Sequence, residues 1–241
     1  MKMGEEFMED KKLKQIIGGL LHDVGKVLYR SADGRNHSVS GYEFLKDEVG
    51  ITDRDILEQV RFHHGKELHH AEIGRDSLAY ITYLADNIAA GADRRTLEEE
   101  AEKGFDPFMA LDSIFNTLNG NQGKAKYLPA TLDPAGGIHF PVEEDVKYNE
   151  AFYKKIRQEI RDLLRNLEYT DSYINSLLEV LEASLSFVPS STARKERADI
   201  SLFDHVKLTA CVGSCLYDYA AENQIQDYQE WVFHNTKMLY E

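Results

Sequence analysis

Hydrophobic residues recur at steps of three and four over most of this 241-residue chain, the spacing that places them on one face of a helix. Residues 11–30 show it most clearly, because their leucines, isoleucines and valines form a single apolar stripe. Several other stretches begin after a capping residue and end at a glycine or proline. They predict further helices over residues 37–48, 52–62, 77–91, 147–168, 171–186 and 201–222. We therefore expect a mostly α-helical fold.

The middle of the chain interrupts this regularity. Residues 105–118 predict a short amphipathic helix with its apolar side chains facing inward, namely Phe108, Leu111, Ile114 and Phe115. Residues 127–142 hold three of the five prolines and two adjacent glycines, and they predict an extended loop or short β-hairpin. The expected organisation is a helical core, an insertion, helices that complete the core and a tail, over residues 1–92, 93–145, 146–225 and 226–241.

Composition is compatible with one large domain, or one domain with an appendage. The chain is 42% hydrophobic, but it has no apolar run near the roughly 20 residues that a membrane span needs. The N-terminus lacks the apolar core of a signal peptide. Cys211 and Cys215 lie four residues apart on a predicted helix, where we expect two reduced, buried side chains. These features predict a cytoplasmic protein.

The net charge of −14 limits the possible substrates. Free-standing nucleic-acid-binding proteins usually present a basic face, and no basic run here exceeds two residues. The substrate is therefore small, or metal ions neutralise its phosphates, or a basic partner holds a polynucleotide. The charge is the main argument against a nuclease.

Candidate chemistry begins at His22-Asp23, within the first predicted helix. An imidazole nitrogen and a carboxylate together bind divalent cations, and the carboxylate can bridge two of them. The chain has 9 histidines, so one such pair can arise by chance. The case depends on further ligands that stand on other predicted helices or at their ends, namely His63, His64, Asp86 and His205, with His37 as a possible fifth.

Each candidate also has an ordinary structural interpretation. His22-Asp23 can be a hydrogen-bonded core pair, His63-His64 can cap a helix end, and His205 can be a packed histidine. Their joint occurrence favours a metal site. Asp86 supports it, because a carboxylate on the apolar side of a helix is costly to bury unless it is paired or metal-bound. Lys26 lies one turn after His22, where it can contact a substrate phosphate.

The ligand types indicate which metals suit the site. Mixed imidazole and carboxylate ligands favour Mn, Ni, Co or Fe over Mg and Ca. Zn ranks below them as well, since the chain has none of the close-spaced Cys/His pairs of a structural zinc site.

The ligand pattern resembles the HD superfamily of metal-dependent phosphohydrolases. That superfamily usually has a lone His first, then His-Asp, further His and a final Asp. Here His-Asp comes first and His205 comes last, which is a circularly permuted order. The permuted form resembles the N-terminal HD domain of the large, palm-domain subunit of type III-A CRISPR effector complexes. The resemblance covers nearly the whole chain, with matching stretches at 20–26, 37–41, 63–65, 85–94 and 199–217.

The resemblance implies a permuted HD helical bundle that acts as a metal-dependent, single-strand DNA nuclease. Asp23 would be the central or bridging ligand, and metal-activated water would hydrolyse the phosphodiester. The partners would be guide RNA and the other subunits, which can supply the basic path that this acidic chain lacks. The full subunit also has palm domains with a Gly-Gly-Asp-Asp motif that make cyclic oligoadenylates. This chain has no such motif, so we expect an isolated HD domain whose tail leads to a missing palm domain.

Two other functions remain open at this stage. Many HD proteins hydrolyse nucleotides or cyclic nucleotides, and the acidic composition mildly favours that alternative. A non-catalytic docking domain with a degenerate site is the third possibility, against which the near-complete ligand set argues.

Overall fold

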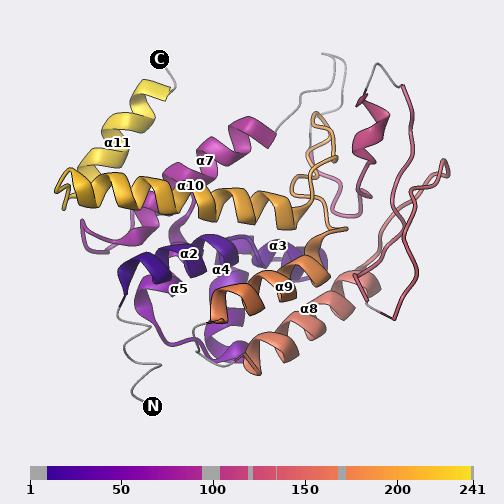
Figure 1. The fold of residues 1–241 in the computed structure, drawn as a ribbon, viewed down its shortest axis with the longest axis horizontal. Coiled ribbons are helices and arrows are strands. Elements are labelled where there is room, and N and C mark those ends of the chain that lie inside the picture. Colours follow the sequence, from indigo (N-terminus) through magenta and orange to yellow (C-terminus); the bar gives the residue numbers. More distant parts are fainter. Residues whose placement is uncertain (1–9, 94–103, 119–121, 134, 168–171, 240–241) are drawn as a thin grey trace.

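The computed structural model describes residues 10–93, 104–118, 122–133, 135–167 and 172–239. The described chain is mostly helical, as the periodicity predicts (Figure 1). Its α-helices are α2 (Lys11–Leu21), α3 (Gly25–Arg30), α4 (His37–Glu43), α5 (Arg54–Phe62), α6 (Gly65–Leu68), α7 (Leu78–Asp93), α8 (Glu150–Arg165), α9 (Tyr173–Leu185), α10 (Leu202–Glu222) and α11 (Tyr228–Leu239). A π-helical turn, η1 (Phe44–Val49), continues α4, and a short 3₁₀ turn, η2 (Ile114–Asn116), lies in the middle segment.

Helices α2, α5, α7 and α10 form the centre of the molecule. α10 packs against α2 and α7, and α5 packs against the same two helices. Segments from opposite ends of the chain thus lie side by side (Figure 1). The close approach needs Gly19 on α2, because a Cβ atom there would lie 2.9 Å from the Cα atom of Ala210 on α10.

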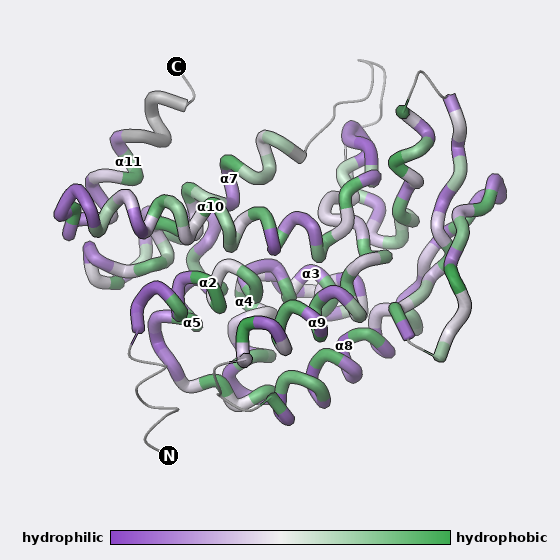
Figure 2. Tube along the Cα trace, in the orientation of Figure 1, coloured by the Kyte–Doolittle hydropathy of each residue, from purple (hydrophilic) through white to green (hydrophobic). Residues whose placement is uncertain are grey.

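The remaining helices extend the core in two directions. α3 and α4 pack together. α8 packs against α3, and α9 packs against α8 and α10. One buried apolar cluster joins these helices to α2, α5 and α10, and a smaller one joins α7 to α11. Hydrophobic positions alternate with hydrophilic ones along α8 and α10, as expected for helices buried on one face (Figure 2).

The first predicted helix is divided at its His-Asp pair. α2 begins after Asp10, whose side chain caps the amides of Lys12 and Leu13, and it ends at Leu21. The backbone then tightens into a turn, in which the amide of Lys26 donates to the carbonyl of Asp23 at 3.0 Å. The continuous apolar stripe conceals this turn, because its residues are buried on both sides of the break.

The predicted helix at 105–118 is wrong. Apart from η2, these residues are irregular, and the backbone amide of Asp112 donates to the carbonyl of Ala198 at 2.8 Å. Long-range partners thereby replace the internal hydrogen bonds of a helix. Leu111 is buried as expected, but Ile114 and Phe115 are 46% and 59% exposed.

The extended character expected for 127–142 is present. Lys126 and Val142 form an isolated antiparallel bridge with reciprocal 2.8 Å hydrogen bonds. The predicted boundary near residue 93 falls beside residues 94–103, which lie outside the described residues. The division into four parts therefore stays a prediction.

The two cysteines of α10 differ from the sequence-based expectation. Cys211 and Cys215 are free thiols, but they are exposed rather than buried. The reason is that other positions of α10, such as Ala210 and Gly213, face its neighbours. In the described part of the chain, no helix is long and apolar enough to cross a membrane.

The contact between α3 and α4 gives a test of the fold. A Cβ atom on Gly25 would lie 1.8 Å from the carbonyl oxygen of His37, so Gly25→Ala must push the two helices apart. We expect a loss of about 1–3 kcal/mol in the free energy of unfolding, measured by chemical denaturation. Gly34→Ala is the matched control, since nothing lies within 4 Å of its Cβ position. Equal stability of the two variants would contradict this packing.

Candidate metal centre

Four potential ligands from three parts of the chain form one buried cluster, which we name cluster A. They are His22 and Asp23 from the turn after α2, Asp86 from α7 and His205 from α10. The Nε2 atom of His205 lies 3.1 Å from Oδ1 of Asp86 and 3.3 Å from Oδ2 of Asp23. Nε2 of His22 lies 3.6 Å from the same Asp86 oxygen. The last candidate in the sequence thus lies beside the first.

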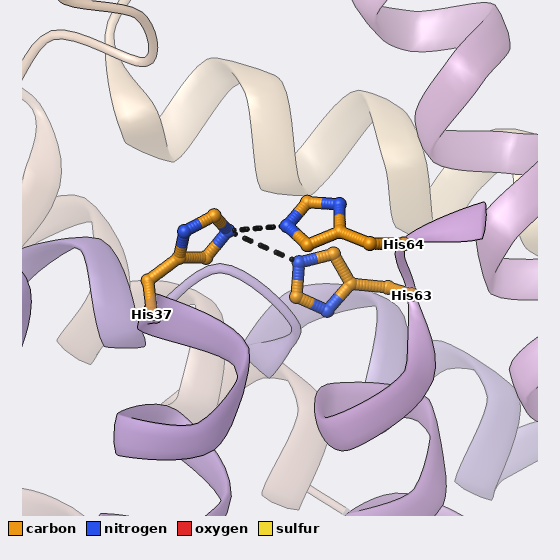
Figure 3. Close-up of side chains that lie close together, drawn as sticks. All are labelled: His37, His63 and His64. Carbon is orange, nitrogen blue, oxygen red and sulfur yellow. Dashed lines mark hydrogen bonds between the residues drawn. The ribbon is translucent and has the colours of Figure 1, made fainter. Parts of the chain in front are cut away.

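Three histidines form a second group, cluster B, next to the first. His37 is the first residue of α4, and His63 and His64 follow the end of α5. Their rings converge, as Figure 3 shows. The Nε2 atom of His37 lies 2.8 Å from Nε2 of His64 and 3.3 Å from Nε2 of His63. Three ring nitrogens therefore face a common point.

Asp23 lies between the two clusters. Its Oδ1 atom is 3.2 Å from Nε2 of His37 and 3.6 Å from Nε2 of His63. Its Oδ2 atom is 3.4 Å from Nε2 of His22 and 3.3 Å from Nε2 of His205. Each carboxylate oxygen thus faces a different cluster, which is the arrangement that a carboxylate shared by two cations requires.

Backbone carbonyls fix two of the rings. Nδ1 of His22 donates to the carbonyl of Gly19 at 2.7 Å, and Nδ1 of His63 donates to that of Val60 at 2.8 Å. Because a carbonyl only accepts, Nε2 of each neutral ring carries a lone pair that points into the site. Such carbonyl contacts orient metal-binding histidines in general.

Unmatched polar atoms fit a cation. Nε2 of His22 and Oδ1 of Asp23 are buried, and neither has a hydrogen-bond partner among the described residues. Buried polar atoms without a partner are costly, whereas a cation would satisfy both of them. The donor set of imidazoles and carboxylates is also one that transition metals accept.

The carboxylates are held in their ionised form. Burial alone would raise the pKa of Asp23, but the charges of Lys26 and His22 outweigh it and hold that pKa well below its ordinary range. Burial likewise opposes ionisation of Asp86, but the hydrogen bond from His205 and the nearby imidazole of His22 outweigh it and lower the pKa of Asp86 instead. Both side chains are therefore anionic ligands at neutral pH.

The histidines differ between the clusters. Burial lowers the pKa of His37 and His63, and burial together with His63 lowers the pKa of His64 to about 4. Cluster B is therefore neutral and ready to bind a cation at pH 7. Burial also opposes protonation of His22, but Asp23 and Asp86 outweigh it and raise its pKa to about 9.

Lys26 lies at the same site, although its contacts are with the protein. Its Nζ atom is 2.5 Å from Oδ2 of Asp23 and donates to the carbonyl of Ser190 at 3.0 Å. It thereby ties the turn after α2 to the loop before α10. The side chain also lines the pocket, so contact with a substrate phosphate stays a prediction.

A pocket of about 410 Å³ opens onto both clusters. Asp86 and His37 are 17% and 22% exposed, whereas His22 and Asp23 are fully enclosed. A substrate therefore reaches the site from the side of Asp86 and His37. The structure brings together all the ligand candidates named from the sequence, but the sequence does not indicate the other side of the pocket, which includes Tyr29, Arg30, Phe105 and Arg197. The order and spacing of Phe105 and Arg197 carry no signal, because two irregular segments far apart in the chain bring them there, whereas Tyr29 and Arg30 lie on α3.

The chain is similar to known proteins both in sequence and in fold. Residues 1–91 match the family described as HD domain. The chain is 36% identical, over 97% of its length, to the CRISPR system single-strand-specific deoxyribonuclease Cas10/Csm1 (subtype III-A) of Mycobacterium tuberculosis, of which it covers 32%. It is also 36% identical to the protein of that name from Enterococcus italicus, over 96% of this chain and 32% of the relative.

The fold is similar to that of a solved structure as well. The Csm1-Csm4 subcomplex in the type III-A CRISPR-Csm interference complex matches with a TM-score of 0.62 and 25% identity, over 86% of this chain and 28% of that one. The chain spans about a third of the length of the curated relatives that it matches. HD domains bind divalent metal ions, and clusters A and B are a possible site for them.

The raised pKa of His22 predicts proton release on metal binding. With a pKa of about 9, His22 is protonated at pH 7.5 and must lose its proton to become a ligand. We expect Mn²⁺ binding to release about 1 proton per protein at pH 7.5, and this number to fall toward zero above pH 9. The apparent Mn²⁺ affinity should rise over the same pH range. Isothermal titration calorimetry in buffers of different ionisation enthalpy measures the proton count. Tight binding without proton release at pH 7.5 would contradict the prediction.

Proposed function

Because the chain belongs to the HD-domain family of subtype III-A Cas10/Csm1 proteins, we propose that it is a metal-dependent nuclease acting on single-stranded DNA. The observation that carries the proposal is Asp23, whose two carboxylate oxygens face two separate groups of metal-binding side chains. A pair of adjacent cations is an arrangement that many phosphodiester-cleaving enzymes use.

We assign the ligands as follows. One cation would be held by cluster A, and the second by cluster B with Asp23 shared between them. Mn, Ni, Co or Fe suits this mixture of nitrogen and oxygen ligands better than Mg, Zn or Ca. When bound, divalent cations supply positive charge to a phosphate and lower the pKa of coordinated water.

The protein's own residues prepare the site for that chemistry. Asp23 and Asp86 stay ionised, and the imidazoles of cluster B stay neutral. Burial of His22 and Asp23 keeps bulk water from competing for their ligand atoms. Lys26 holds the Asp23 carboxylate and lies within the pocket, where it is placed to contact a phosphate.

The partners follow from the charge and from the relatives. A net charge of −14 does not attract DNA over the surface as a whole, so other subunits would guide the strand. The similar Csm1 chain is bound to Csm4 in the type III-A CRISPR-Csm interference complex. We propose that this chain acts in such a complex with guide RNA, in the cytoplasm.

The rival is hydrolysis of free nucleotides or cyclic nucleotides. The acidic composition favours it, and a 410 Å³ pocket is in the size range of small-molecule sites. Purified protein with Mn²⁺ should cleave labelled single-stranded DNA, with duplex DNA and a nucleotide panel hydrolysed at least about tenfold more slowly. Faster turnover of a nucleotide than of any DNA would support the rival instead.

Removal of the shared carboxylate is the direct test of the metal site. Asp23→Ala should reduce Mn²⁺-dependent cleavage by at least about 100-fold, since loss even of an indirect metal partner costs 10–100-fold. Circular dichroism should show an unchanged helical content. Asp218→Ala is the control and should keep full activity, because this half-exposed side chain of α10 pairs with Lys12 away from the pocket. Undiminished cutting by Asp23→Ala, after removal of contaminating nucleases, would refute the assignment.

A further inference from the structure

A second wall of the pocket lies apart from the metal ligands. Two segments that are far apart in the sequence form it, residues 104–106 and 190–197. Phe105 and Ala193 make an isolated antiparallel bridge, and the amide of Asp106 donates to the carbonyl of Thr192 at 2.9 Å. The amide of Arg194 donates to the carbonyl of Gly104 at 2.9 Å as well. The backbone therefore holds this wall in place.

Phe105 is an exposed aromatic side chain on the wall of the pocket. It is 70% exposed, although its ring lines the same cavity as Asp23, Asp86 and His205. Within the described residues its ring stacks on no other aromatic side chain. Exposed aromatic rings are the surfaces on which proteins stack unpaired bases, since every base has a flat π-face.

Arg197 is a cation of the same wall, and the structure gives it no ion-pair partner among the residues it describes. Lys26 contacts Asp23 and Ser190, and Arg30 donates to the carbonyl of Pro189 at 2.8 Å. Arg197 lines the pocket and is half-buried, yet it makes no ion pair within the described residues. A guanidinium binds phosphate through two parallel N–H groups, and the low exposure strengthens that contact.

We infer that Phe105 and Arg197 form a nucleotide subsite beside the metal centre. The base next to the cleaved phosphodiester stacks on Phe105, and an adjacent phosphate binds Arg197. This inference rests on the proposed nuclease function and adds to it the residues that select the strand. A base can stack on Phe105 only when it is unpaired, so the subsite discriminates against duplex DNA.

Single substitutions test the two residues separately. Base stacking on an aromatic residue is worth about 1–3 kcal/mol. Phe105→Ala should therefore weaken binding of a fluorescein-labelled oligothymidylate in Ca²⁺ by about 5- to 150-fold, measured by fluorescence anisotropy. Phe105→Tyr should keep near wild-type affinity because it keeps the ring. Arg197→Ala should weaken binding too and should lower its salt dependence, because one phosphate contact is lost.

Matched controls separate the subsite from general surface effects. Phe140 is 72% exposed but lies outside the pocket, so Phe140→Ala should bind like the wild type. Arg165 is an exposed arginine of α8 outside the pocket, and Arg165→Ala controls for the loss of one positive charge. Equal losses in Phe105→Ala and Phe140→Ala would overturn the inference, and would indicate instead a nonspecific effect of apolar surface.

An abasic substrate tests stacking itself. Oligonucleotides that lack one base at successive positions around the cleavage site should be cut more slowly by the wild type when the stacked base is missing. Phe105→Ala should cut that abasic strand as slowly as the intact one, so the two losses are not additive. Additive losses at every position would show that Phe105 does not contact a base, and would overturn the inference.

The failures of the two proposals are distinguishable. If the wild type cleaves single strands and Phe105→Ala cleaves and binds them equally well, the subsite is refuted and the nuclease stands. If the wild type cleaves no DNA but binding still depends on Phe105 and Arg197, the subsite stands as a strand-binding site and the nuclease falls.

Discussion

Burial of the Asp23 carboxylate is the constraint on which the rest of the structure depends. Its side chain is 2% exposed, and an ionised group there costs several kcal/mol unless opposite charges and hydrogen-bond donors surround it. Lys26 and His22 supply the opposite charge, and imidazoles from four different segments surround the carboxylate, whose Oδ1 atom is left for a cation. The turn after α2, the start of α4, the end of α5 and the first turn of α10 must therefore converge on one side chain.

That convergence explains why the helices pack where they do. α10 can bring His205 to Asp23 only because Gly19 lets its backbone approach α2, and α4 can bring His37 only because Gly25 leaves room for its carbonyl. The packing of the helices therefore determines the geometry of the site. A side chain added at either glycine displaces a ligand as well as a helix.

The sequence indicates which ligand candidates come together because their chemistry is local. A histidine beside an aspartate, or a carboxylate such as Asp86 on an apolar face, is recognisable from its neighbours in the sequence, although His22 and Asp23 lie in the turn after α2 and not within a helix. The helix predicted over residues 105–118 is wrong for the opposite reason. Their apolar spacing is helical, but the amide of Asp112 pairs with Ala198, a partner 86 residues away that no local pattern reveals. The exposure of Cys211 differs from the expectation for a similar reason. The apolar positions of α10 do not indicate which of its faces the neighbouring helices cover.

The segment that sequence reasoning placed wrongly is also the one that completes the pocket. Because Phe105 pairs with Ala193 instead of entering a helix, it lines the pocket that opens onto the metal centre. The same pairing holds the loop that carries Arg197, which adds a positive charge to a strongly acidic chain inside the pocket where we propose that a phosphate binds. Cations bound at Asp23 would add further positive charge a short distance away. Attraction for a strand is thus concentrated within the pocket rather than spread over the surface, and an acidic chain can still act on a polyanion.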